Sequence, residues 1–574
     1  MADTFFSFTT YLDGIQENYG PLEDFRKEEA PFKEKRDHLI GMEMGEANPN
    51  EYGFHQGEMA KKVNYFLKDK LLIQHQQPID EFHFNALSPT TQPIQESAGL
   101  VHIPARVSET PENNKQMPHP SPLASSLKLL TSYGSGFKKL KGEKLIKVET
   151  ETSGTSDKLS TVEIMKVAGA RYVQFSTQMC DDYNYMAVHP FGFALSGLSD
   201  DDKRDVELAH LLLAAAEKVG YQQYERAERM LLRCEWVSSA RGDPAQRVIY
   251  HFAEALRERI EKESGTVTMK GFEEKDEIVQ GLTNTPTFLI NYKQLPFTQV
   301  LVFTGIQTMV ETIASERKVH LIDMGIRYGV HWTVLMQALA DRHDYPIELL
   351  KITAVGSTDI EEIGTRLASF AKSLNLPFSF KSVILSDMKD AKEELFETEE
   401  GEAIIIYAPY VLRTMIPTPD SLENLMRVMR NLNPTMMVVI ESEGNHNSPS
   451  FVNRFTDALF YYSAYYESLD TCMKQYDEDR IRLETIFGDA IRNIVAEEGE
   501  ERTIRSVPLD VWRAYFGRFG MVEIGISESS FKQAGLVLQK FDCRSCCTIH
   551  RNGKSLVVGW KGTPIHSLSV WGFC

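Results

Sequence analysis

Val319-His320-Leu321-Ile322-Asp323 is the segment from which the fold class can be inferred most directly. It is a short apolar run that ends on a carboxylate, and Gly325 and Gly329 follow it closely. A strand covered on both faces has this composition, because both rows of its side chains are buried. The segment 330–342 comes next and has helical periodicity. We therefore expect a strand–helix unit of a parallel sheet to begin at Val319.

Downstream of this run, apolar stretches alternate with helical segments. Strands separated by helices predict βαβ units and a parallel sheet with helices on both faces, and so an α/β fold. Near the C-terminal end, Asn552-Gly553 lies between β-rich runs and predicts a hairpin. Further strands are predicted at 348–355, 378–385, 403–408 and 435–441, and further helices at 359–374, 421–431 and 451–469.

Upstream of Val319 the sequence is helical and rich in leucine. Ser199 and the acidic residues after it are N-capping residues, and apolar residues recur at helical spacing over 206–219. Further amphipathic helices are predicted over 221–238 and 244–263. Leucines in this pattern form either a core or a partner surface, and the periodicity alone leaves both interpretations open.

The first 155 residues differ in composition from the rest. Pro, Ser, Thr, Asn and Gln dominate 88–126, which holds too little apolar surface to offset the entropy of ordering the chain. Residues 5–15 are aromatic and are interleaved with acidic residues, which indicates either a segment that folds onto a partner or an unstructured tail. We expect a largely disordered region over 1–155 and one domain over 156–574. That domain would have a helical cap at about 200–315 and an α/β core at about 316–574.

The net charge of the 574-residue chain is −19. This charge disfavours DNA binding driven by phosphate neutralisation, unless basic residues gather on one face. Arg226, Arg229, Arg233 and Arg241 are the candidates for such a face, but glutamates are interleaved with them. No apolar stretch approaches the ~20 residues that span a bilayer, so no membrane association is predicted. The seven scattered cysteines form no disulfide framework and indicate a reducing, intracellular compartment.

The end of the first strand is where a doubly wound sheet places a ligand. Asp323 followed by glycines resembles the corresponding segment of an S-adenosylmethionine methyltransferase, but the glycine spacing is G-x-x-x-G. Gly356-Ser357-Thr358 stands where an acidic residue would hold the ribose. Cys543, Cys546, Cys547 and His550 have a metal-like spacing, yet they lead into one hairpin strand, which favours reduced structural cysteines. No catalytic, cofactor-binding or metal-binding residue is predicted, and the chain is not expected to be an enzyme.

These segments, in this order, resemble the plant GRAS family of transcriptional regulators. Residues 319–323 are similar to the family's VHIID motif, with leucine-rich regions at 206–260 and 422–469 on either side. The family's PFYRE and SAW regions also have counterparts, and the resemblance spans about 160–574. The matching residues are Val319, His320, Leu321, Ile322, Asp323, Gly325, Gly329 and Trp332 for VHIID, Pro377, Phe378, Tyr407 and Tyr410 for PFYRE, and Trp560, Ser569 and Trp571 for SAW.

Two departures bear on the branch of the family. The N-terminal region contains no DELLA or VHYNP sequence, so the resemblance implies no gibberellin-receptor binding of the DELLA type. Residues 403–415 read AIIIYAPYVLRTM in place of a more polar, Asn-Cys-like stretch. The chain therefore resembles a divergent scarecrow-like, DELLA-related branch.

The resemblance implies a methyltransferase-like Rossmann core with a helical cap and a C-terminal β-hairpin, recruited for protein binding. It implies a nuclear co-regulator, present in the cytoplasm as well, that contacts DNA only indirectly. Its partners would be DNA-binding transcription factors, among them zinc-finger proteins, and other GRAS proteins in homo- or heterodimers. A sequence-specific DNA-binding factor, and an S-adenosylmethionine-type enzyme or sensor, stay open as alternatives. Partner-binding candidates are Leu208, Leu212, Leu213, Leu231 and Leu232, and nuclear-import candidates are Lys138, Lys139, Lys141 and Lys144.

Overall fold

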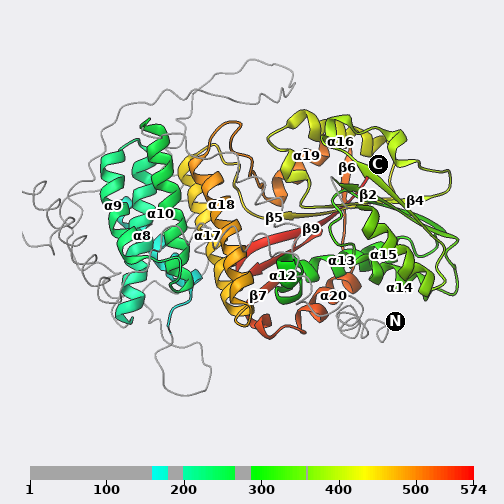
Figure 1. Cartoon of the computed structure of the whole chain (residues 1–574), viewed down its shortest axis with the longest axis horizontal. Coiled ribbons are helices and arrows are strands. Elements are labelled where there is room, and N and C mark those ends of the chain that lie inside the picture. Colours follow the sequence, from blue (N-terminus) through cyan, green and yellow to red (C-terminus); the bar gives the residue numbers. More distant parts are fainter. Residues whose placement is uncertain (1–157, 179–197, 266–285, 357–359, 574) are drawn as a thin grey trace, which may run out of the picture. The chain divides into compact units, whose positions relative to one another are not determined.

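A nine-stranded mixed sheet lies at the centre of the fold (Figure 1). The computed structural model describes residues 158–178, 198–265, 286–356 and 360–573. The strand order is β3-β2-β1-β4-β5-β9-β8-β7, and β6 pairs with β9 beside β8. The strands are β1 Lys318–Asp323, β2 Leu349–Gly356, β3 Phe378–Ile384, β4 Ala403–Pro409, β5 Met436–Ser442, β6 Met521–Ile524, β7 Cys547–Asn552, β8 Ser555–Trp560 and β9 Thr563–Phe573.

The first half of the sheet, from β3 to β5, is parallel. β1 lies between β2 and β4, with Val319 opposite both Leu350 and Ala403. β1, β2, β4 and β5 are buried along nearly their whole length, as expected for strands with helices on both faces. The five strands predicted between residues 319 and 441 are confirmed. The arrangement is the predicted α/β core, with the strand order β3-β2-β1-β4-β5 of a Rossmann-like parallel sheet.

The second half of the sheet is antiparallel and depends on β9. One edge of β9 pairs with β5, and the other pairs with β8 and then with β6. β7 and β8 form the hairpin predicted at Asn552-Gly553, and Gly553 adopts a φ of +60° in its turn. The sequence did not predict that β9 joins this hairpin to the parallel strands.

Helices cover both faces of the sheet (Figure 1). α16 (Pro419–Asn431) and α19 (Leu509–Gly517) pack on one face, where Met437 and Val439 of β5 enter their apolar core. α13 (Pro296–Thr312) packs on the other face, where a Cβ at Gly305 would lie 3.5 Å from Val438. α14 (Trp332–Ala340), α15 (Ile360–Ser373) and α20 (Glu528–Leu538) accompany α13. Short 3-10 helices are η4 (Met388–Asp390), η5 (Glu393–Phe396), η6 (Leu412–Met415) and η7 (Asp542–Ser545).

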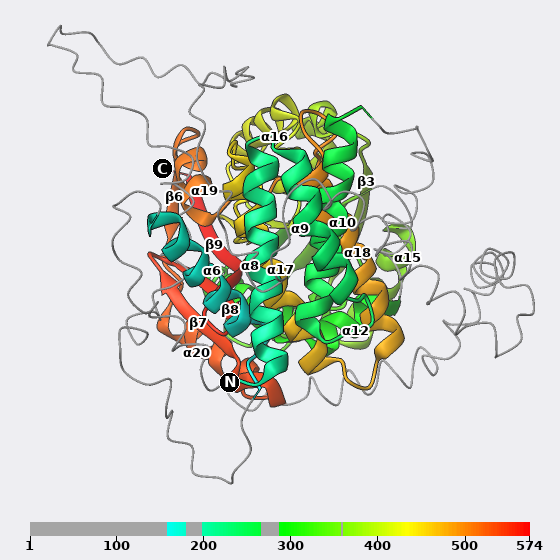
Figure 2. The same ribbon diagram turned by 90° about the vertical axis from the view of Figure 1, so that its left-hand side faces the viewer.

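A layer of long helices lies beside the sheet (Figure 2). α8 begins at the capping residue that the sequence indicated, since Ser199 accepts from the N–H of Asp202 at 3.1 Å, and α10 begins after Asp243, which accepts from the N–H of Gln246 at 3.0 Å. The layer comprises α8 (Asp200–Gly220), α9 (Tyr224–Val237), α10 (Pro244–Glu263), α17 (Phe451–Cys472) and α18 (Asp477–Ala496), and α6 (Thr161–Gln178) and α12 (Pro286–Gln294) complete the helices.

Helices from both sides of the predicted cap boundary mix in space. α13 lies before residue 315 and packs against β8 and β9, whereas α17 and α18 lie after it and pack against α10. The division at about residue 315 stays a prediction. The disordered region predicted over 1–155 lies outside the described residues.

Candidate functional site

Asp323 ends β1 and is fully buried. Its Oδ1 accepts a hydrogen bond of 3.0 Å from the N–H of Gly325, and its Oδ2 accepts one of 2.8 Å from the indole Nε1 of Trp332. Burial raises the pKa of Asp323 to about 6, against the lowering effect of these hydrogen bonds. Trp332 is the first residue of α14, so the carboxylate joins the end of the strand to the start of the following helix.

The two glycines after β1 differ in how closely the chain packs around them. Gly329 has a φ of +66°, and a Cβ there would lie 2.9 Å from Ile363 of α15. A Cβ at Gly325 would meet Pro409 and Val411 at 3.8 and 3.9 Å, in ordinary contact. At Gly329, then, both the backbone conformation and the neighbouring helix require glycine.

This geometry does not fit an S-adenosylmethionine site. Both oxygens of Asp323 accept hydrogen bonds from the chain's own donors, the N–H of Gly325 and the indole of Trp332. Residues 357–359, which follow β2, lie outside the described ranges. The cofactor-like sequence pattern at 323–329 is thus explained by hydrogen bonding and packing within the fold.

The other VHIID residues are part of the core. Val319, Leu321 and Ile322 are buried in β1. His320 is also fully buried, and its ring nitrogens contact Thr353 at 2.8 Å and Glu402 at 3.1 Å. Burial lowers its pKa to about 4, so at neutral pH it is a neutral ring that ties β1 to its neighbours.

Most of the leucines predicted to bind partners are buried. Leu208, Leu212 and Leu213 of α8 and Leu231 of α9 face the interior of the helical layer, so the prediction of a partner surface is wrong for these four. The physical reason is that α10 and α17 pack against α8, and α8 and α10 against α9, which buries the leucine-rich faces inside the chain itself.

Leu232 alone of the five candidate leucines is exposed, at 50%. Trp236 lies one helical turn further along α9 and is 69% exposed. Arg229 and Arg233 are exposed on the same face of the helix, at the spacing i, i+3, i+4, i+7 with Leu232 and Trp236. Sequence reasoning missed Trp236, although its spacing from Leu232 could have indicated a shared face. We call these four residues the α9 patch.

Three of the arginines considered for DNA binding, Arg226, Arg229 and Arg233, follow one side of α9, but each has a partner within the chain. Arg233 lies 3.7 Å from Glu207, and the Nε of Arg229 donates to the carbonyl oxygen of Glu225. Arg226 donates to the side chain of Gln223 at 3.2 Å. Glutamates on the same helix balance these charges.

A buried polar cluster, which the sequence did not predict, lies at the ends of β4 and β5. The N–H of Arg413 donates to Glu441 at 3.2 Å, and its guanidinium donates to Ser442 at 2.5 Å. Burial raises the pKa of Glu441 to about 7. Tyr410 adopts a φ of +57°, which is rare for an aromatic residue, and its ring packs on His566 at 5.0 Å between centroids.

This cluster connects the sheet to the helical layer. His566 lies on β9, and its Nε2 is 2.6 Å from the hydroxyl of Tyr465 on α17. His446, in the loop after β5, packs on Tyr461 and Tyr462 of α17. The aromatic and ionic contacts of the cluster hold α17 in one position against the ends of the strands.

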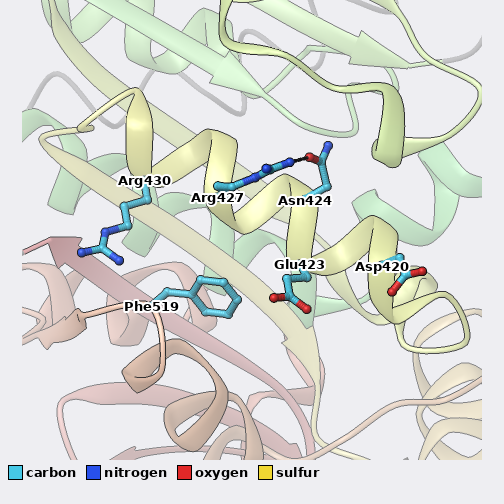
Figure 3. Close-up of a pocket in the computed structure, with 6 residues that line it drawn as sticks. All are labelled: Asp420, Glu423, Asn424, Arg427, Arg430 and Phe519. Carbon is cyan, nitrogen blue, oxygen red and sulfur yellow. Dashed lines mark hydrogen bonds between the residues drawn. The ribbon is translucent and has the colours of Figure 1, made fainter.

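A hollow of about 430 Å³ lies on the outer side of α16 (Figure 3). Arg427 is hydrogen-bonded to Asn424, and the ring of Phe519 lies between Arg430 and Glu423 in this view. Leu422 and Leu425 of the same helix face the sheet and are buried. The second leucine-rich region therefore also contributes core, and its exposed side is charged.

The GRAS domain family model matches residues 208–572. The chain belongs to the GRAS family. The matched residues contain most of the helical layer and the nine strands of the sheet, apart from the last residue of β9. The family comprises plant transcriptional regulators, as its curated members below illustrate.

Curated GRAS relatives are DELLA proteins. DELLA protein RGL1 of Arabidopsis thaliana is 30% identical over 375 residues, which cover 65% of this chain and 71% of that protein. DELLA protein 1 of Medicago truncatula is 28% identical over 393 residues, or 65% of this chain and 64% of the relative. This GRAS chain thus spans about two thirds of the length of these relatives.

A solved GRAS structure has the same fold. The crystal structure of SCL7 from Oryza sativa is 26% identical, covers 63% of this chain and 99% of its own, and superposes with a TM-score of 0.58. The resemblance to a scarecrow-like, DELLA-related GRAS protein is therefore confirmed.

The SAW residues of this GRAS protein are buried in the antiparallel half of the sheet. Trp571 lies on β9, donates to Ser569 at 2.9 Å and packs on Phe516. Trp560 ends β8 and packs on Phe297. Trp571 thus joins β9 to α19, and Trp560 joins β8 to α13.

Lys138, Lys139, Lys141 and Lys144 lie outside the described residues. Within the described ranges, no group of His, Cys, Asp or Glu is arranged to hold a metal ion, and no helix is long and apolar enough to cross a bilayer.

Proposed function

We propose that this GRAS protein is a nuclear transcriptional co-regulator that acts through protein–protein interaction. Its partners are DNA-binding transcription factors, among them zinc-finger proteins, and other GRAS proteins, and it reaches DNA only through them. The observation that supports this proposal is the α9 patch, where Leu232 and Trp236 are exposed beside Arg229 and Arg233.

The composition of the α9 patch is that of an interface centre. Trp and Arg are enriched among the residues that dominate binding energy, and an exposed tryptophan costs little conformational entropy when a partner covers it. Ala227, Leu231 and Cys234 of α9 are buried, and Met230 and Val237 are half-buried, so the strongly exposed apolar surface of the helix is that of the α9 patch. A partner with an apolar anchor and acidic residues beside it would complement this strip.

The two alternatives have less support. A DNA-binding factor needs a basic face, and the arginines of α9 share their helix with Glu225, Glu228 and Glu235. An S-adenosylmethionine enzyme needs free acceptors at the end of β1, and those of Asp323 bond to Gly325 and Trp332. We therefore expect no methyl-transfer activity.

The test is a pairwise binding assay between the purified chain and individual plant zinc-finger factors and GRAS proteins. Trp236→Ala and Leu232→Ala should abolish the binding that the wild type shows, with an unchanged melting temperature. Leu536→Ala, on α20, is the matched control, because Leu536 is exposed to a similar extent at 48%. Wild-type affinity in both α9 variants would overturn the assignment of the patch.

Nuclear import is the second element of the proposal. Lys138, Lys139, Lys141 and Lys144 form the basic segment that would serve it. Replacing all four by alanine in a fluorescent fusion should move the protein to the cytoplasm. A fusion that stays nuclear would show that these lysines are only a solvated charge run.

A further inference from the structure

A group of cysteines lies where α17, η7 and β7 meet, and the proposed function makes no use of it. Cys472 is the last residue of α17, Cys543 lies in η7, and Cys547 begins β7. Cys546 stands between η7 and β7, and its N–H donates to the carbonyl oxygen of Cys543 at 2.9 Å. All four cysteines are free thiols.

The thiol of Cys543 is at the centre of this group. It forms hydrogen bonds with the thiols of both Cys472 and Cys547. Because Cys472 and Cys543 are far apart in the sequence, this contact depends on the docking of η7 against the end of α17. The described residues offer no arrangement suited to a metal ion here, so thiol chemistry is the chemistry that remains for the cluster.

The hydrogen bonds make the thiols unequal. The hydrogen bonds donated by Cys472 and Cys547 hold the pKa of Cys543 well below the usual value of a thiol. The same hydrogen bonds raise the pKa of Cys472 and that of Cys547 above the usual value. Cys543 is thereby the thiol of the group that loses its proton most readily, and the thiolate is the form that attacks an oxidant. Cys234 offers a contrast within the same chain, since burial raises its pKa to about 12.

The geometry favours Cys472 as the thiol that closes a disulfide. Sulfur atoms in hydrogen-bond contact must approach to ~2.05 Å to form that bond, so one of the two cysteines has to move. Cys547 is held in the ladder of β7, opposite Trp560, and is buried. Cys472 ends its helix and is partly exposed. Movement is therefore easier at Cys472.

We propose that Cys543 and Cys472 form a reversible, peroxide-sensitive disulfide. The Cys543 thiolate attacks one oxygen of hydrogen peroxide, the O–O bond breaks, and hydroxide leaves and takes up a proton to become water. The resulting sulfenic acid is attacked by the Cys472 sulfur, its S–O bond breaks, and a second water leaves. Two thiols lose two electrons and two protons, and one peroxide becomes two waters. The bond covalently links the end of α17 to the segment that leads into the C-terminal hairpin.

The experiment treats the full chain with stoichiometric hydrogen peroxide and maps the peptides by mass spectrometry without reduction. We expect a cross-linked peptide pair containing Cys472 and Cys543, which dithiothreitol separates. Cys472→Ser should lose the cross-link but keep a sulfenic acid at Cys543, which dimedone traps. Cys546→Ser is the matched control and should still form the cross-link.

Two results would overturn the proposal. One is a disulfide between Cys543 and Cys547, or between Cys546 and Cys547, in place of the expected pair. The other is equal reactivity of Cys543, whose exposed fraction is 8%, and Cys234, which is fully buried. Because Cys543→Ser could fail to fold, the wild type also provides a direct readout. Its Cys543 should react with iodoacetamide faster than Cys546 at a pH below the usual thiol pKa, and equal rates would contradict the assignment.

Discussion

The indole Nε1 of Trp332 donates a 2.8 Å hydrogen bond to Oδ2 of Asp323, and both residues are fully buried. Trp332→Phe removes this donor and leaves the carboxylate with the N–H of Gly325 as its remaining partner. We expect a loss of about 1–3 kcal/mol in the free energy of unfolding, measured by urea denaturation, because an acceptor is left buried and unpaired. Asp323→Asn combined with Trp332→Phe provides the double-mutant cycle. Additive effects of the two changes would show that the contact contributes nothing.

The glycines after β1 give a matched pair of variants. Gly329→Ala introduces a Cβ 2.9 Å from Ile363 in a backbone with positive φ, and it should cost about 1–3 kcal/mol of stability. Gly325→Ala introduces a Cβ at 3.8 Å from its nearest neighbour and should change stability by less than about 1 kcal/mol. Thermal and urea unfolding of both variants measure the difference. Equal losses would mean that packing does not account for the choice of glycine at 329.

Glu441 makes stability depend on pH. Its pKa is raised from 4.5 to about 7 in the folded chain, chiefly by burial, so the folded state holds a proton that the unfolded state releases. Stability from this group is present below pH 4.5 and is lost as the pH rises toward 7. Relative to Glu441→Gln, the free energy of unfolding of the wild type should fall by on the order of 1 kcal/mol per pH unit as the pH rises across this window, which urea denaturation at several pH values would measure.

The groups around Glu441 either oppose this pH dependence of stability or do not affect it. Arg413 favours the ionised carboxylate, and Tyr461 of α17 does not titrate in this range because burial raises its pKa to about 12. His446 and His566, with pKa values lowered to about 3 by burial, contribute stability that is lost as the pH falls. Comparing the wild type with Glu441→Gln cancels the histidine contribution. Parallel stability curves for the two proteins would exclude titration of Glu441.

The two tryptophans of the SAW region should differ when each is replaced by phenylalanine. Trp571 donates to Ser569, whereas the indole N–H of Trp560 has no acceptor among the described residues. Trp571→Phe should therefore cost about 1 kcal/mol more than Trp560→Phe. Alanine at either position should cost about 3–5 kcal/mol, since both side chains are buried in the core. Calorimetric unfolding measures all four variants, and a smaller loss for Trp571→Phe would contradict the hydrogen-bond argument.

Local signals were sufficient to predict most of the elements. α10 spans Pro244–Glu263 as predicted, because Asp243 caps it and proline fixes its first turn. The apolar runs became strands because their length and composition suit a sheet covered on both faces. The turn at Asn552-Gly553 formed because glycine adopts the positive φ that it needs.

Features that depend on distant contacts could not be predicted. Leu231 and Leu232 are adjacent and chemically identical, yet only the helices packed around α9 decide that the first is buried and the second exposed. The pairing of Met437 with Trp571 joins strands that no local pattern relates. The left-handed backbone of Tyr410 is likewise imposed by its surroundings, since a tyrosine has no local preference for it.

β9 follows every other strand in the sequence and yet lies inside the sheet, between β5 on one edge and β8 and β6 on the other. During synthesis, the parallel strands leave the ribosome with one edge of β5 unpaired until β9 is available. Until the C-terminal strand has been made, the nascent chain therefore exposes the unpaired edge of β5, and an exposed strand edge favours aggregation. A stop codon anywhere before Thr563 would remove the strand that joins the two halves of the sheet, so even late truncations should behave as null alleles.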